Sequence, residues 1–221
     1  MHNQWVAVDD YIVGLFPSDP TLDAVLRATR EAGMPQINVS PVQGRLLHVL
    51  ALTCGARKIL EIGTLAGYSA IWMARALPAD GKLITLEADP KHADVARANI
   101  AHAGLADRIE VRLGVALEAL PQIAAEGEGP FDLIFIDADK MNLTTYFDWA
   151  VRLARPGSLI IADNVIRSGE VLNASGADVG LQGVRRFNEA LAADRRVTAT
   201  IVQMVGSKGY DGMALAVVRG E

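Results

Sequence analysis

Apolar residues recur along this chain with two different periods, and the change of period separates its elements. In the first quarter the spacing is helical and predicts amphipathic helices over residues 6–15, 22–32 and 41–53. Asp19 and Ser40 are suitable N-caps for the second and third helices, and Gly33 and Gly55 are suitable residues to end them. The beginning of the chain is therefore expected to be helical.

From residue 58 onward, short β-rich runs alternate with helical patterns. The runs cover residues 58–63, 82–89, 109–113, 131–139 and 158–164, and the helical patterns cover 70–76, 90–103, 116–125 and 143–153. This alternation predicts βαβ units and a parallel sheet. Residues 196–205 and 212–218 are strand-like and are joined by the glycine-bearing link 206–211, which predicts a terminal antiparallel hairpin. The fold class is α/β.

Composition narrows the possible roles. With 221 residues, 51% of them hydrophobic, the chain can form a single domain over 1–221, with residues 1–55 as a helical cap and 56–221 as the core. A net charge of −5 argues against binding to duplex nucleic acid or to an anionic membrane. The single cysteine, Cys54, excludes an internal disulfide, and the first residues lack the basic start of a signal peptide. We expect a soluble, cytoplasmic protein.

Polar side chains follow several of the predicted strands at their carboxyl ends, where open parallel sheets bind ligands. The first run carries Glu61 and Gly63, and the second ends at Glu87. The remaining polar strand ends belong to the fourth and fifth runs, with Asp137, Asp139, Lys140, Asp163 and Asn164. These residues are expected to meet at one rim of the sheet and to form a site there.

The glycine motif of the first strand end has the spacing E-x-G-x-x-x-G, from Glu61 to Gly67. It lacks the third glycine of dinucleotide-binding turns, and the Glu61 carboxylate would repel a diphosphate. A cationic nucleoside without phosphate fits better, and S-adenosylmethionine is the obvious candidate. The alternative is that the glycines only make a tight turn between strand and helix.

Four stretches, "EIGTLAGYS", "LEADPKHADVARANIAHAG", "FIDADK" and "ADNVIRSGEV", resemble the cation-dependent class I O-methyltransferases, the group of catechol and caffeoyl-CoA O-methyltransferases. The resemblance runs from about "NVSPVQG" to the C-terminal hairpin. It implies a Rossmann-like, seven-stranded, mostly parallel sheet with helices on both faces and a reversed last strand. It also implies S-adenosylmethionine, a divalent cation and a homodimer.

The resemblance assigns roles to individual residues. Lys140 matches the proposed general base, and the metal ligands are matched by Asp137, Asp163 and Asn164. The cofactor contacts that it implies are Val39, Glu61, Gly63, Thr64, Ser69, Glu87, Ala116, Asp137 and Asp139. Among these, Ser69 is expected near the methionine carboxylate, Glu87 at the ribose and Ala116 beside the adenine. Oxygen ligands of this kind suit magnesium best, and calcium or manganese also fit.

The substrate is the least determined part of the prediction. Arg167 and Ser168 stand where the plant caffeoyl-CoA enzymes have tryptophan and asparagine, and the link 206–211 is longer than the usual short connection. Without a clear basic patch for coenzyme A, a small catechol or other vicinal diol is the expected substrate. Two alternatives are a hydroxylated nucleoside in tRNA, which the acidic balance disfavours, and a cofactor-binding sensor module without catalysis. His92 and His102 are expected to be solvated.

Overall fold

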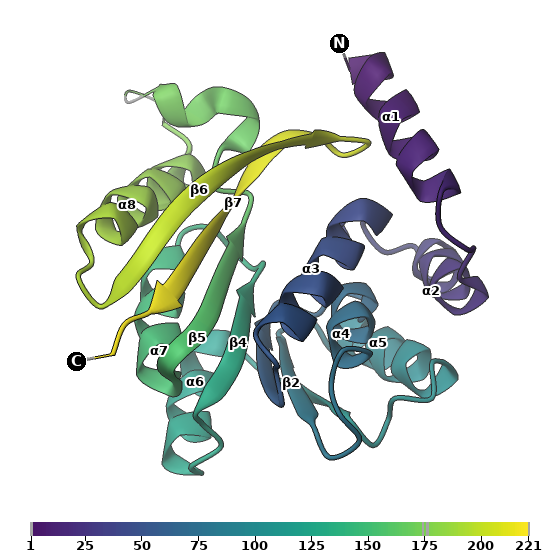
Figure 1. Ribbon diagram of the computed structural model, residues 1–221, viewed down its shortest axis with the longest axis horizontal. Helices are drawn as coiled ribbons and strands as arrows, with labels where there is room; N and C mark the ends of the chain where they lie inside the picture. The colour runs from purple at the N-terminus through teal and green to yellow at the C-terminus, as the bar shows by residue number, and fades with distance from the viewer. Residues whose placement is uncertain (1, 174, 176, 221) are drawn as a thin grey trace.

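A single mixed sheet of seven strands organises the computed structural model, which describes residues 2–173, 175 and 177–220 (Figure 1). The strand order is β3-β2-β1-β4-β5-β7-β6, and only the pairings of β7 with β5 and β6 are antiparallel. The strands are β1 Lys58–Ile62, β2 Lys82–Glu87, β3 Ile109–Leu113, β4 Phe131–Ile136, β5 Ala154–Asp163, β6 Val197–Gly206 and β7 Gly209–Val218. The predicted Rossmann-like α/β fold with a C-terminal antiparallel hairpin is confirmed.

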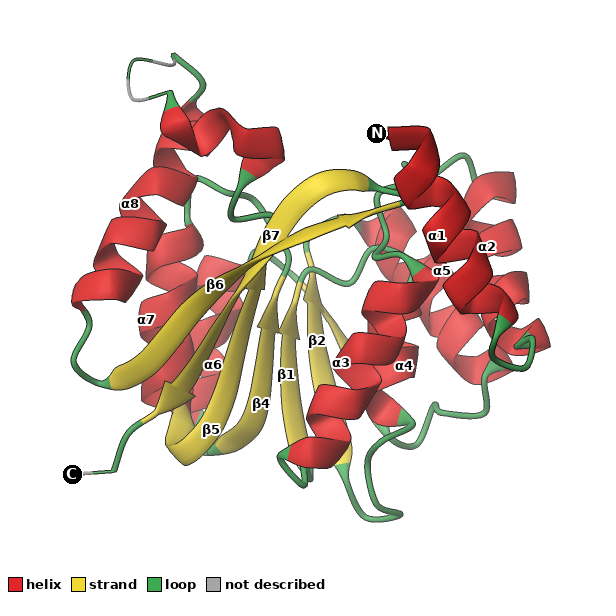
Figure 2. Ribbon diagram, turned by 45° about the horizontal axis from the view of Figure 1, so that its top comes forward, coloured by secondary structure: helices red, strands yellow, loops and turns green. Residues whose placement is uncertain are grey.

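Helices cover both faces of the sheet (Figure 2). They are α1 His2–Gly14, α2 Pro20–Glu31, α3 Pro41–Thr53, α4 Tyr68–Ala74, α5 Pro90–His102, α6 Ala116–Ala125, α7 Leu143–Leu153 and α8 Val179–Ala193, with a 3₁₀ segment η1 at Arg167–Leu172. The caps expected at Asp19 and Ser40 are confirmed, because each side chain accepts a hydrogen bond from its helix. No helix in the described part of the chain is long and apolar enough to cross a bilayer.

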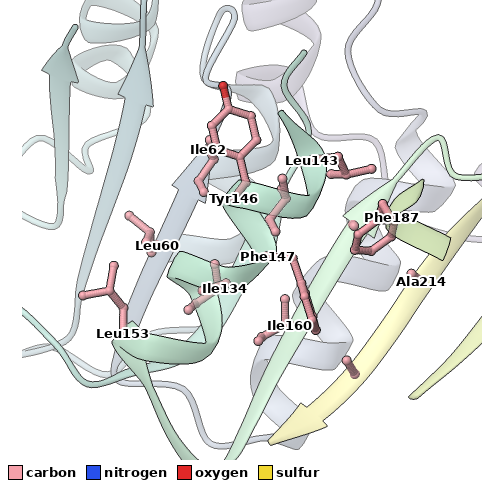
Figure 3. Close-up of a cluster of buried hydrophobic side chains, with 14 of the residues drawn as sticks. Leu60, Ile62, Ile134, Leu143, Tyr146, Phe147, Leu153, Ile160, Phe187 and Ala214 are labelled. Atoms are coloured by element: carbon pink, nitrogen blue, oxygen red, sulfur yellow. The ribbon is translucent and has the colours of Figure 1, made fainter. Parts of the chain in front are cut away.

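Each buried strand contributes alternate side chains to two separate apolar cores, as the two-residue period of a strand requires. In β4, Ile134 and Ile136 face the core beneath α6, α7 and α8 (Figure 3), whereas Leu133 and Phe135 face the core beneath α2 to α5. All six residues of β4 are buried, so the run that precedes Asp137 lies in the middle of the molecule. The sheet therefore holds the ends of β1, β4 and β5 in fixed positions.

The structure corrects the predicted hairpin link. Gly206 pairs with Gly209, so the two strands continue to a turn of two residues, Ser207 and Lys208, and the link 206–211 expected from the sequence is wrong. Gly209 has a φ of +97°, which favours glycine and allows this tight turn. The α8 helix and η1 were not in the set of expected elements, because glycines inside them, Gly169 in η1 and Gly180 and Gly183 in α8, interrupt the helical pattern.

The hairpin tip reaches the N-terminal helix, although the two are almost 200 residues apart in sequence (Figures 1 and 2). The buried carboxylate of Asp9 in α1 accepts a hydrogen bond from the backbone N–H of Ser207 at 2.7 Å. A Cβ on Gly206 would lie 2.6 Å from an oxygen of Asp9, so a side chain there would separate the two elements. This contact places α1 beside the edge of the cavity described next.

Candidate active site

A cavity of about 820 Å³ lies beyond the carboxyl ends of β1, β2, β4 and β5. The segment 36–43, α1 and the β6–β7 hairpin complete its wall. We call the wall formed by Gly63, Thr64, Ser69 and Glu87 the β1–β2 side. The opposite wall, formed by Asp9, Arg167, Lys208 and Asp211, is the hairpin side, and the ends of β4 and β5 lie between the two.

Gly63 is the residue that allows the ends of β1 and β4 to approach each other. Its φ is +102°, and a Cβ at this position would lie 2.1 Å from the carbonyl oxygen of Asp137. Neither the conformation nor the space suits a side chain. The glycine thus has a packing role in addition to any contact with a ligand.

Glu87 presents its carboxylate to the cavity in a fixed orientation. One oxygen accepts the N–H of Leu65 at 2.8 Å, and the other accepts the N–H of Asp89 at 3.0 Å. Nδ1 of His92 lies 3.7 Å from the second oxygen. Each carboxylate oxygen has a further lone pair, so Glu87 can accept two more hydrogen bonds from a ligand.

Glu61 does not line the cavity, unlike the other residues proposed as cofactor contacts. It is fully buried behind the β1–β2 side, where its oxygens accept hydrogen bonds from Ser69 at 2.5 Å and Thr85 at 2.6 Å. Burial raises the pKa of Glu61 to about 8, although these two hydrogen bonds act to lower it. Glu61 can therefore reach a ligand only through a neighbour such as Ser69, which does line the cavity.

Two carboxylates and an ammonium meet between the two sides. Nζ of Lys140 donates to Oδ1 of Asp137 at 3.2 Å and to the carbonyl oxygen of Asp163 at 3.1 Å. Burial, and next the negative charge of Asp137, raise the pKa of Asp163 to about 7. Asn164 follows with a φ of +59°, a conformation that asparagine tolerates better than most residues. The arrangement concentrates oxygen ligands and one amine in a small part of the wall.

Asp139 lies at the rim of the cavity and is tied to α7. Its carboxylate accepts hydrogen bonds from the backbone and side chain of Asn142 and from the Tyr146 hydroxyl. Burial and this hydrogen bond both raise the pKa of Tyr146. The Tyr146 proton therefore stays on the hydroxyl and keeps the Asp139 carboxylate in place.

The structure brings together most of the residues that the sequence selected. The cavity is lined by Val39, Gly63, Thr64, Ser69, Glu87, Ala116, Asp137, Asp139, Lys140, Asp163 and Asn164. Other polar lining residues were not selected from the sequence, among them Asp9, His92, Tyr146, Lys208 and Asp211, and Arg167 was noted only as a departure from the plant enzymes. His92, expected to be solvated, lies beside Glu87 because α5 starts directly after β2. The sequence did offer a signal for His92, namely its position in the first turn of the helix that follows β2.

The chain is similar to known proteins of one family. The O-methyltransferase family matches residues 17–218. The chain is 58% identical to a catechol O-methyltransferase of Niastella koreensis over 99% of this chain and all of that protein. It is 49% identical to a catechol O-methyltransferase of Mycobacterium tuberculosis, over 96% of this chain and 93% of that one.

The fold comparison identifies a solved structure with the same architecture. An O-methyltransferase from Bacillus cereus, in complex with S-adenosylhomocysteine (SAH), superposes with a TM-score of 0.97 at 55% identity, over 99% of this chain and 100% of that one. SAH is what S-adenosylmethionine becomes when it has lost its methyl group. The chain belongs to the O-methyltransferase family and is an S-adenosylmethionine-dependent enzyme.

Proposed function

We propose that this enzyme methylates one hydroxyl of a small catechol-type diol and that it requires a divalent cation. The observation that carries the proposal is the meeting of Asp137, Lys140, Asp163 and Asn164 between the two sides of the cavity. The names of the two catechol O-methyltransferases support the substrate class. The net charge of −5 favours a small molecule over tRNA, because RNA binding depends on neutralising phosphates.

The donor atoms near Lys140 fit a hard cation. Asp137 and Asp163 supply carboxylate oxygens and Asn164 an amide oxygen, and magnesium prefers such ligands while keeping positions for substrate and water. Burial, and next the negative charge of Asp137, raise the pKa of Asp163; Lys140 only partly balances this charge, and a cation would balance it further. In the described residues, no three His, Cys, Asp or Glu side chains form a metal-binding group, so the amide is needed to complete this set. Calcium or manganese could be held by the same atoms.

The β1–β2 side is proposed to hold S-adenosylmethionine. Glu87 would accept hydrogen bonds from the ribose hydroxyls with the lone pairs that Leu65 and Asp89 leave free. Ser69 would contact the methionine part, and Asp139 would approach its amino group. The remaining contacts proposed are Val39, Gly63, Thr64, Ala116 and Asp137 from the wall, with Glu61 acting through Ser69.

Lys140 is proposed as the general base. When bound, the cofactor supplies an electrophilic methyl group, and the cation lowers the pKa of the diol hydroxyls. In its neutral amine form, Nζ of Lys140, held over Asp137 and Asp163, would accept the proton of the hydroxyl that is methylated and become the ammonium. The side chain is only 12% exposed, which limits competition from water.

The helices of residues 1–55 are proposed to act as a cap, because Asp9 and the segment 36–43 form part of the cavity wall. We also infer a homodimer in which α1 contributes to the interface. Val8, Tyr11 and Leu15 of this region are 49%, 67% and 61% exposed, and a second copy of the chain would cover this apolar surface. Sedimentation of a monomer at micromolar concentration would refute the homodimer.

Chelation tests the proposed function most directly. We expect EDTA to abolish methylation of catechol, magnesium or manganese to restore it, and Asp163→Ala to remain inactive at ordinary metal concentrations. Asp80→Ala, which removes a 70% exposed carboxylate far from the cavity, is the matched control and should respond like the natural enzyme. Full turnover after exhaustive chelation would exclude the cation.

A further inference from the structure

Two cationic side chains line the hairpin side of the cavity. Arg167 begins η1, directly after the loop that carries Asn164, and Lys208 forms half of the two-residue turn between β6 and β7. The sequence separates them by about 40 residues, so their convergence on one wall is a result of the fold. Neither takes part in the chemistry proposed above.

The fold holds Arg167 in an uncommon conformation. Its φ is +52° and that of Ser168 is +55°, values in the left-handed region that cost energy for residues other than glycine. A carboxylate maintains this backbone, since Oδ1 of Asp211 accepts the N–H groups of Ile166 and Arg167, both at 2.9 Å. The same oxygen accepts the N–H of Gly212 at 2.9 Å, which fastens the loop to β7. Asp211 thereby fixes where the Arg167 side chain starts.

The guanidinium of Arg167 is not paired with a carboxylate in the part of the chain that the structure describes. Within residues 2–173, 175 and 177–220, its guanidinium has no hydrogen-bond or ion-pair partner, and the group lies at the cavity wall. The nearby carboxylates of Asp9 and Asp211 accept backbone N–H groups instead. Guanidinium groups bind planar carboxylates through two parallel hydrogen bonds, which gives Arg167 an obvious type of partner.

Lys208 adds a second positive charge to the same wall. Its Nζ donates to the carbonyl oxygen of Gln36 at 2.8 Å, so one donor is used on a neutral group and two remain. Partial burial lowers the pKa of Lys208, because it disfavours the charged ammonium. An anion bound at this wall would stabilise the ammonium and would therefore raise the pKa of Lys208 again.

We propose that the preferred substrate is a catechol that carries an anionic group, which Arg167 binds with support from Lys208. The inference rests on the proposed function, because it assumes that the diol occupies the region between the two sides. The diol would lie at Asp137, Asp163 and Asn164, and its anionic substituent would point to the hairpin side. The anion is a carboxylate of a small catechol or a phosphate of a coenzyme A thioester, and the test separates these two sources.

The test compares acids with their neutral esters. Calorimetry with S-adenosylhomocysteine and magnesium present would measure binding of protocatechuate, caffeate, the methyl ester of each, and caffeoyl-CoA. We expect at least one free acid to bind about tenfold or more tightly than its ester, as a charge-assisted bidentate contact provides. A preference for caffeoyl-CoA over both caffeate and its ester would assign the anion to phosphate.

Variants connect the preference to Arg167. Arg167→Met should remove the difference between acid and ester while leaving ester affinity unchanged, and Lys208→Met should reduce it in part. Arg186→Met removes an exposed arginine from α8 outside the cavity and should keep the full preference. Equal binding of acids, thioester and esters by the natural enzyme would overturn the inference, as would a preference that survives Arg167→Met. Methylation of neutral catechol in the same preparations reports separately on the proposed function.

Discussion

The two sides of the cavity differ in how far along the chain their residues lie from one another. On the β1–β2 side, Gly63, Thr64, Ser69 and Glu87 all belong to two consecutive strands, the loop that follows the first of them, or the helix between them. The hairpin side instead combines α1, the start of η1 and the turn between β6 and β7. One side is therefore a local product of the βαβ unit, and the other exists only after the whole chain has folded.

This difference indicates which part of the cavity can change its substrate specificity. The β1–β2 side depends on backbone geometry that side chains cannot replace. A Cβ on Gly63, for example, would lie only 2.1 Å from the carbonyl oxygen of Asp137. On the hairpin side, Arg167 and Lys208 are exposed side chains at the start of η1 and in the β6–β7 turn, and surface segments of this kind tolerate substitution more easily. We infer that cofactor binding is the constant function of this cavity and that substrate choice is the variable one.

The largest effect is expected between the two sides, at Lys140. Lys140→Met should lower turnover of catechol by ~10²–10⁴-fold, because a general base typically contributes that much. Steady-state kinetics would measure it, and calorimetry with S-adenosylhomocysteine should show unchanged binding. Lys91→Met, an exposed lysine of α5, is the control. Near-normal turnover of Lys140→Met would move the proton acceptor to water.

The next effect concerns the β1–β2 side alone. Glu87→Ala should weaken S-adenosylmethionine binding at least tenfold, since hydrogen bonds to a charged group contribute ~1.5–3 kcal/mol each. Isothermal calorimetry would measure this loss, and Glu118→Ala on the exposed face of α6 provides the comparison. If affinity is unchanged, Glu87 does not contact the cofactor. A change in the acid–ester preference would show that the two sides are not independent.

The third effect is a pH dependence of stability at Glu61. Its folded pKa of about 8 lies above the ordinary glutamate value of ~4.3, so the folded state binds the extra proton between these values. The free energy of unfolding should therefore decrease as pH rises through this window, by at most about 1.4 kcal/mol per pH unit from this group.

Glu61→Gln should flatten that dependence, because glutamine keeps the shape of the protonated acid without its titration. Urea unfolding at several pH values would measure the difference from the natural enzyme. Glu189→Gln, on an exposed part of α8, should leave the profile unchanged. Parallel profiles for the natural enzyme and Glu61→Gln would mean that Glu61 is ionised throughout the range.

The same contrast explains what the sequence could predict. Residues such as Glu87 and Asp137 end strands whose apolar pattern is clear, and parallel pairing brings the ends of such strands to one edge. Asp9 and Asp211 had no such signal, because their positions depend on the hairpin reaching α1 and on Asp211 binding three N–H groups. The motif assigned Glu61 to the cofactor. Its burial in the structure shows that Ser69 lies between Glu61 and the cavity.

The buried group of Glu61, Ser69, Thr85 and Thr64 has a consequence for the direction of its hydrogen bonds. Three contacts join the four side chains, from Ser69 to Glu61, from Thr85 to Glu61, and between Thr64 and Thr85 at 2.6 Å. With Glu61 ionised, the three hydroxyl protons are all used in these contacts, and Ser69 can only accept from a ligand. With Glu61 protonated, four protons serve three contacts, and one hydroxyl proton of Ser69 or Thr64 is left to point into the cavity. The protonation state of the buried Glu61 thereby sets whether the wall offers a donor to a carboxylate or only acceptors to an ammonium.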